Sequence, residues 1–144
     1  MLAEKVLQYC NQNMKTFSKE ERLCSRKSLD LLFKNGSSFL LYPYRISYLF
    51  VPETAPYPVQ VVINVSKKRY KRAVDRNLIK RRTREAYRSK KQEELYLLMD
   101  KPNELLLLSI QFIGKKIYPY DFLDQKMGNL LKKLVTVLAA HEVS

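Results

Sequence analysis

Thirteen lysines and arginines stand close together in the middle of the sequence, and side chains of this type bind anions. The chain has 27 basic and 14 acidic residues, and thirteen of the basic ones fall between positions 66 and 91. Only Asp75 and Glu85 oppose them in that segment. Because most of the net charge of +13 is concentrated on one stretch, the sequence predicts a surface that meets a polyanion.

The helical spacing of this segment separates the cations from a packing surface. Residues 71–91 are predicted to be helical, and at about 100° per residue four of them share a narrow apolar stripe. The apolar stripe consists of Ile79, Thr83, Ala86 and Tyr87. The adjoining face carries a cationic ridge of Asn77, Lys80, Arg81, Arg84 and Arg88, with Arg76 at the border between the two. One side of this helix can therefore pack on a sheet while another side stays charged.

The spacing of the cationic ridge favours an external anionic partner. Like charges four residues apart, as in Lys80 and Arg84, destabilise a helix by about 0.2–0.5 kcal/mol per pair. Folding alone gains nothing from such pairs, whereas a phosphate backbone would relieve the repulsion and release counterions. A solvated helix usually intersperses acids among its bases, and a membrane-surface helix needs large apolar residues where Thr83 and Ala86 stand. Contact with a nucleic acid is therefore the preferred interpretation.

No set of residues suggests a protein active site. The single histidine, His141, lies near the C-terminus, and Cys10 and Cys24 have no neighbouring histidine that could complete a nucleophile or a zinc site. Asp121 and Asp124 are three residues apart, but acids are favoured at a helix N-terminus in any case. We expect neither a catalytic residue nor a bound metal in the protein.

Two further helices are expected around the basic one. Ser25 is a candidate N-cap for a helix that ends near Gly36. Its apolar face consists of Leu29, Leu32 and Phe33. Pro119 opens a last helix, which is expected to run to about residue 140.

Four strands are predicted from alternating or continuous apolar residues. They cover residues 39–41, 44–50, 59–65 and 104–114. The last segment is almost wholly apolar, which is typical of a strand buried on both faces. Three prolines between positions 52 and 58 indicate a hairpin-like loop between the second and third strands. The order of helix, three strands, helix, strand and helix predicts a single α+β domain.

Length and composition fit one globular domain. The 144 residues are 46% hydrophobic, which is enough for one modest core. We expect a flexible N-terminal extension at 1–16, a domain at 17–140 and a tail at 141–144. Residues 1–16 contain no apolar signal-peptide core, no apolar run is long enough to cross a bilayer, and two cysteines do not make a disulfide framework. A cytoplasmic protein is the expectation.

The centre of the sequence resembles the motif of the bacterial ribonuclease P protein family. Residues 65–68 are V-S-K-K and residues 76–81 are R-N-L-I-K-R. In that family a strand ending in V-[SA]-K-K leads into R-N-R-x-K-R on a helix. The resemblance covers roughly residues 17–138. Two positions depart from it, because Leu78 stands where the family has arginine, with Arg82 as a candidate substitute, and Leu29 stands where the first helix usually has an aromatic residue.

The resemblance implies a fold like the second domain of ribosomal protein S5. Its crossover from the third strand through the basic helix to the fourth strand is left-handed, against the usual preference. It also implies a subunit that binds a large catalytic RNA and the 5′ leader of precursor tRNA, while the RNA and its Mg²⁺ hydrolyse the phosphodiester bond. The free protein would be monomeric or weakly self-associating and would need no cofactor of its own.

Site residues are carried over from the resemblance by position. Those implied to contact the catalytic RNA are Lys67, Lys68, Arg72, Arg76, Asn77, Lys80, Arg81, Arg84 and Arg88. The leader is expected in a cleft between the first helix and the sheet. Candidates there are Phe33, Tyr44, Arg45, Ser47 and Tyr48. For the three aromatic residues core packing is the alternative. For Tyr44 and Tyr48 the sequence does not settle which way their strand faces.

Two other functions stay open from the sequence. A structural RNA-binding protein of the ribosome would have the same basic surface. A metal-dependent nuclease acting without RNA would need a cluster of carboxylates, and none is visible in the sequence. Stimulation of the catalytic RNA at low magnesium would separate the first function from both alternatives.

Overall fold

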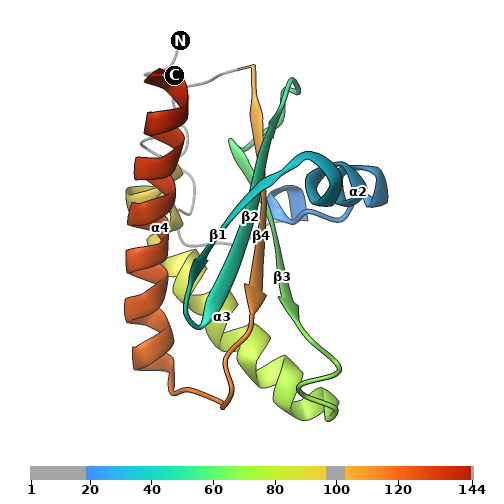
Figure 1. The fold of residues 1–144 in the computed structure, drawn as a ribbon, viewed down its shortest axis with the longest axis vertical. Helices are drawn as coiled ribbons and strands as arrows, with labels where there is room; N and C mark the ends of the chain where they lie inside the picture. The colour runs from blue at the N-terminus through green and yellow to red at the C-terminus, as the bar shows by residue number, and fades with distance from the viewer. Residues whose placement is uncertain (1–18, 97–102, 144) are drawn as a thin grey trace.

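The computed structural model describes residues 19–96 and 103–143, with side chains to residue 140, and forms one sheet with helices on both faces (Figure 1). The elements in chain order are η1 (Lys19–Glu21), α2 (Arg26–Asn35), β1 (Ser37–Leu41), β2 (Tyr44–Val51), β3 (Val59–Val65), α3 (Ala73–Glu94), β4 (Leu105–Phe112) and α4 (Tyr120–Val143). The predicted α+β order is confirmed, and α4 continues three residues past its expected end. The expected extension at 1–16 lies outside the described residues.

The apolar strand β4 takes a central position in the sheet, whose order is β1-β2-β4-β3. β4 pairs antiparallel with β2 and parallel with β3, and its residues 105–110 are all buried. The hairpin-like loop predicted at 52–58 is therefore wrong, because β4 lies between the strands that this loop joins. A strand that is apolar on both faces is stable when another strand pairs with each of its edges and helices cover both faces. β4 therefore lies between β2 and β3.

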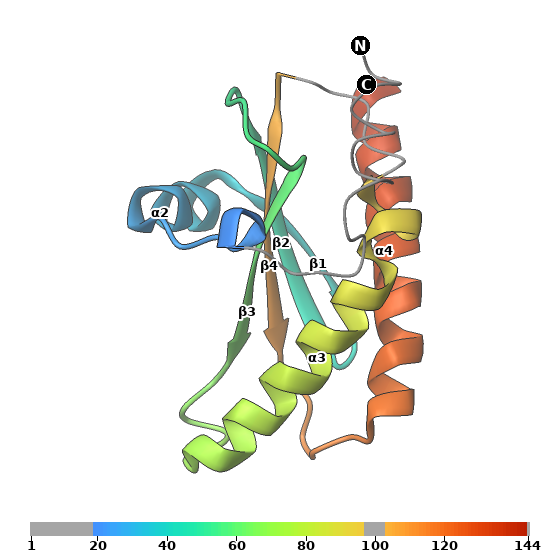
Figure 2. The same cartoon turned by 180° about the vertical axis from the view of Figure 1, so that it is seen from behind.

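The crossover from β3 through α3 to β4 is left-handed. In Figure 2, β3 runs downward, α3 returns upward in front of the sheet, and β4 then runs downward to the right of β3. Turning the view in the plane until the strands point upward places β4 to the left of β3 with the helix in front, which is the rare hand. The expected topology is confirmed. This arrangement places the basic segment along the β3 side of the sheet.

Two apolar cores lie on opposite faces of the sheet. Alternate residues of all four strands, such as Ile46, Val61 and Leu108, pack against α3 and α4 in the larger core. The other face carries a smaller core in which Leu32 of α2 packs on Leu107. Because successive residues of a strand point to opposite faces, this division decides which strand residues lie beside α2.

Helix α2 begins and ends as the sequence predicts. The Ser25 side chain accepts a hydrogen bond from the Ser28 amide at 3.3 Å, and the Gly36 amide donates to the Leu32 carbonyl at 2.8 Å. A Cβ at Gly36 would lie 2.4 Å from the Leu32 carbonyl oxygen and 3.0 Å from that of Tyr48. Glycine is therefore needed here because a side chain would clash with the last turn of α2 and would press against the backbone of β2.

Candidate nucleic-acid interface

The predicted apolar stripe of α3 is its packed face. All four of its residues, Ile79, Thr83, Ala86 and Tyr87, are fully buried. The Thr83 hydroxyl lies 2.9 Å from the hydroxyl of Tyr44 on β2, so the one polar member of the stripe has a partner. This packing fixes the rotation of α3 about its axis and thereby decides which of its cations face outward.

The cationic ridge remains on the outer side of α3. Asn77, Arg81 and Arg84 are exposed and Lys80 is half-buried. Lys67 and Lys68 in the turn after β3, and Arg72 at the N-terminus of α3, are exposed at one end of the ridge. Within the described residues, none of these lysines and arginines forms an ion pair with a carboxylate of the protein. The arrangement leaves a row of cations for an external anion.

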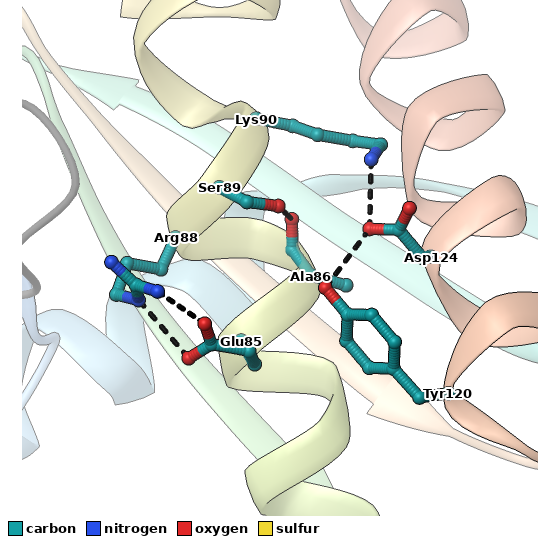
Figure 3. Close-up of polar contacts among 7 residues, drawn as sticks. All are labelled: Glu85, Ala86, Arg88, Ser89, Lys90, Tyr120 and Asp124. Carbon is teal, nitrogen blue, oxygen red and sulfur yellow. Dashed lines mark hydrogen bonds and ion pairs between the residues drawn. The ribbon is translucent and has the colours of Figure 1, made fainter.

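Other cations of the basic segment are held by the protein's own carboxylates (Figure 3). Arg88 forms a bidentate pair with Glu85 one turn earlier, and this hydrogen bond lowers the pKa of Glu85. Lys90 reaches across to α4 and lies 2.7 Å from Asp124, which also accepts a hydrogen bond from Tyr120 at 3.3 Å. The charge of Arg88, a predicted RNA contact, is therefore shared with Glu85, and Lys90 joins α3 to α4.

Three arginines near the start of α3 bind main-chain carbonyls. Arg76 donates to the carbonyls of Tyr70 and Lys71 at 2.8 and 2.9 Å, which ties the preceding loop to the helix. Arg82 donates to the Tyr118 carbonyl at 2.6 Å, and Arg69 donates to the carbonyl of Ile113. Arg82, the proposed substitute for the arginine missing at position 78, thus holds the loop before α4.

The leader-binding candidates separate onto the two faces of the sheet. Phe33 is 59% exposed, so the packing alternative for this ring is wrong. Tyr44 is fully buried and Tyr48 is 7% exposed, and both belong to the core beneath α3 and α4. The expectation that these tyrosines line the leader site is therefore wrong, because even-numbered positions of β2 face away from α2.

Arg45 and Ser47 lie on the same face of the sheet as α2. Arg45 is exposed, and the strand register places it beside Gln111 of β4, which in turn pairs with Asn64 of β3. Ser47 pairs in the same way with Ser109. The sequence prediction missed Asn64 and Gln111, although each is a polar residue within an apolar strand, and that was the signal that could have found them.

Neither a metal cluster nor a membrane span is found in the described part of the chain. No group of three or more histidine, cysteine, aspartate and glutamate side chains comes together at 19–96 or 103–140. No helix among the residues described is both long and apolar enough to cross a bilayer. The predicted absence of protein catalytic residues stays a prediction, and His141 and Cys10 lie outside the described side chains.

Sequence comparisons identify relatives over most of the chain. The family model described as Ribonuclease P matches residues 17–135. A ribonuclease P protein component from Chlorobium phaeobacteroides is 31% identical over 132 residues, which cover 85% of this chain and 90% of that protein. One from Porphyromonas gingivalis is 42% identical over 74 residues, which cover 51% of this chain. That match spans about half of the relative, 54% of its length.

Solved structures agree with the fold. The ribonuclease P protein of Thermotoga maritima has a TM-score of 0.60 at 24% identity, covering 78% of this chain and 96% of that one. The Staphylococcus aureus protein has a TM-score of 0.59 at 19% identity, covering 81% and 96%. Together with the match of the family model to residues 17–135 and the outward row of cations on α3, these similarities show that the chain belongs to the ribonuclease P protein family.

Proposed function

We propose that this chain acts as the protein subunit that supports RNA-based removal of the 5′ leader from precursor tRNA. The observation that carries the proposal is the ridge on α3, where exposed cations have no carboxylate partner in the part of the chain described. Arginine presents a planar fork of donors that suits phosphate oxygens, and Lys67 and Lys68 extend the surface at one end. The partner of this surface is the catalytic RNA.

The open part of the sheet beside α2 is the proposed site for the leader. Phe33 offers an exposed ring for stacking on an unpaired base, a contact worth about 1–3 kcal/mol. Arg45 supplies a cation for a phosphate, and Asn64 and Gln111 supply amide groups that can hydrogen-bond to a base edge. In this division the protein binds and positions both RNAs, and the catalytic RNA with its Mg²⁺ performs the hydrolysis.

Reconstitution tests the whole proposal. The purified chain is added to the catalytic RNA of Porphyromonas gingivalis ribonuclease P at low magnesium, and cleavage of precursor tRNA is followed. We expect faster cleavage with both components than with the RNA alone, and no cleavage by the protein alone. If general RNA binding persists without any acceleration, a structural RNA-binding role replaces the proposal. Cleavage by protein free of RNA would indicate a nuclease instead.

The leader site has its own test. Phe33→Ala removes an exposed ring without disturbing the core, and Leu31→Ala, at a neighbouring side chain of α2 that is 39% exposed, is the matched control. We expect the Phe33 variant to weaken binding of precursor tRNA about 5- to 150-fold while binding to the catalytic RNA stays unchanged. Equal effects of the two variants would place the leader elsewhere.

A further inference from the structure

A second surface combines lysines with aromatic rings along α4, on the β1 side of the molecule. Its residues, here called the lysine–aromatic stripe, are Phe39, Lys116, Tyr118, Phe122, Lys126 and Lys133. They come from β1, the loop before α4, and α4 itself. β1 and β3 are the two edge strands, and Figure 1 shows α4 beside β1, whereas α3 contacts β3.

Each lysine of the stripe lies over one ring. The ammonium groups of Lys116, Lys126 and Lys133 are 5.3, 5.4 and 5.0 Å from the ring centres of Tyr118, Phe122 and Phe39. Lys116 and Lys133 are exposed, and the three rings are half-buried, each with one part against the protein body. Each of the three rings thus has a flexible lysine side chain over it.

Three residues of the stripe lie along one face of α4. Phe122, Lys126 and Lys133 fall within about 40° on α4 and span about 16 Å along the helix. Tyr118 stacks on Phe122 with ring centres 4.4 Å apart and an interplanar angle of 21°. The Lys133 ammonium also lies 3.5 Å from the carbonyl of Leu40, a residue of β1 that is 57% exposed.

We infer that this stripe binds an unpaired RNA strand, with phosphates on the lysines and bases on the rings that the lysines now cover. Surfaces that bind single strands combine cations along the backbone with aromatic rings under successive bases. Stacking of a base on a ring strengthens binding about 5- to 150-fold, whereas an exposed cation–π contact is worth only about two- to fivefold. A lysine therefore gains by leaving its ring for a phosphate while a base takes its place.

The net positive charge around the stripe favours binding of an anionic RNA strand. Lys115 is exposed beside Lys116, and its amide donates to the Tyr42 hydroxyl at 3.1 Å. Of the nearby acids, Asp124 is paired with Lys90, and exposed Asp121 is about 100° around α4 from Phe122. This inference goes beyond the proposed function, because the stripe is separate from both the ridge and the sheet face beside α2.

Base stacking can be measured directly in the full-length chain. The parent is the Phe33→Ala variant, which removes the exposed ring of the leader site. The probe is a single-stranded RNA of about 12 nucleotides that contains the fluorescent base 2-aminopurine, whose emission is quenched when it stacks. We expect quenching by the parent, and loss of quenching when Lys116, Lys126 and Lys133 are changed to glutamine or when Phe122→Leu is introduced.

The same variants give a quantitative prediction. The triple lysine change should weaken binding of the strand at least tenfold and lower the slope of log affinity against log salt by about 2, at roughly 0.7 per phosphate contact. The matched control, Lys80→Gln with Arg84→Gln, removes cations of the ridge and should retain the quenching. Quenching that survives in both stripe variants, or that is lost only in the ridge control, would overturn the inference.

Failure of this inference can be told apart from failure of the proposed function. If the stripe does not bind RNA, the stripe variants quench the probe as strongly as the parent does. They also stimulate precursor cleavage in the reconstituted enzyme as the parent does. If the proposed function fails, no form of the protein stimulates cleavage, whatever happens to the probe. Binding of an acidic protein to these lysines, without any binding of RNA to them, would also count against the inference.

Discussion

At the scale of single residues, the functional surface depends on which cations already have a partner. Arg76, Arg82 and Arg69 bind carbonyls, and Arg88 and Lys90 bind carboxylates. Lys91, also on α3, forms a buried ion pair with Glu21. The charges of Lys80, Arg81 and Arg84 form no ion pair within the described residues. In the proposed function, Lys80 and Arg84 therefore bind RNA without contributing to folding, and this separation can be tested by substitution.

Changing both Lys80 and Arg84 to glutamine should weaken binding to the catalytic RNA about 10- to 100-fold, or about 1.4–2.8 kcal/mol. The salt slope should fall by roughly 2, since each lost contact removes about 0.9. The melting temperature should stay the same or rise, because the change removes a repulsive i, i+4 pair. Fluorescence titrations at several salt concentrations and thermal unfolding measure these effects.

A charge-matched control shows whether position matters. Changing Lys27 and Lys132 to glutamine also removes two positive charges, but from exposed positions on α2 and α4. Equal losses of affinity and slope in the two double variants would mean that only the total charge counts, and the assignment of the ridge would then be wrong.

Buried tyrosines are a second residue-scale feature with a measurable consequence. Burial raises the pKa of Tyr44 to about 12, against a partial lowering by its hydrogen bond to Thr83. The unfolded chain ionises this phenol near pH 10. The folded pKa is the higher one, so the stabilisation is complete below pH 10 and is lost as pH rises through 12. We expect the free energy of unfolding to fall by about 2–3 kcal/mol over that range.

Urea unfolding at a series of pH values, with the ultraviolet absorbance of tyrosinate, measures this loss. Tyr44→Phe should remove its share of the pH dependence and cost about 1 kcal/mol near neutral pH, because Thr83 loses its hydroxyl partner. Burial also raises the pKa of Tyr87 and Tyr96, so some dependence should remain. Full ionisation of all tyrosines in the folded protein near pH 10 would contradict the prediction.

At the scale of elements, η1 is attached to the far end of α3 by a buried ion pair. Lys91 and Glu21 are 2% and 1% exposed, and Glu21 also accepts a hydrogen bond from Tyr96 at 2.7 Å. Glu21→Gln should cost about 3–5 kcal/mol, because it leaves the buried ammonium without its counter-charge. The double change with Lys91→Met should cost less than the sum of the single changes. Urea unfolding of the three variants measures the coupling, and additive losses would contradict it.

The approach of α2 to β2 gives another test at this scale. Gly36→Ala should cost about 1–3 kcal/mol, since the new methyl group would clash with two backbone carbonyls. Gly128→Ala is the control, because a Cβ there meets only the flexible side chain of Lys90, at 3.2 Å, within a helix that prefers alanine. Thermal unfolding of both variants provides the measurement, and a neutral effect at Gly36 would show that α2 can shift.

At the scale of the whole molecule, three surfaces lie on different elements, and the sheet separates the α2 side from the side covered by α3 and α4. The ridge lies on α3 towards β3, the proposed leader site lies on the face beside α2, and the stripe lies along α4 and β1. A protein arranged in this way can contact RNA on several sides at once. The leader site and the stripe each combine residues from segments that are distant in the sequence.

The sequence by itself determined the elements and the face of α3. Local signals at Ser25 and Gly36, the period of two in β2, and the spacing of Ile79, Thr83, Ala86 and Tyr87 all act within a few residues, so they are visible in the chain. The cationic ridge followed from the same helical period. The resemblance then supplied the topology and the motif residues.

Only the tertiary structure decided which strands pair and which groups the charged side chains contact. The position of β4 between β2 and β3 and the burial of Tyr44 and Tyr48 depend on which strands meet and which face each side presents. Arg82, Lys90 and Lys91 bind groups far away in the sequence, and Arg45, Gln111 and Asn64 come from three different strands. Such contacts arise from the packing of distant segments, and the spacing of residues along the chain carries no information about them.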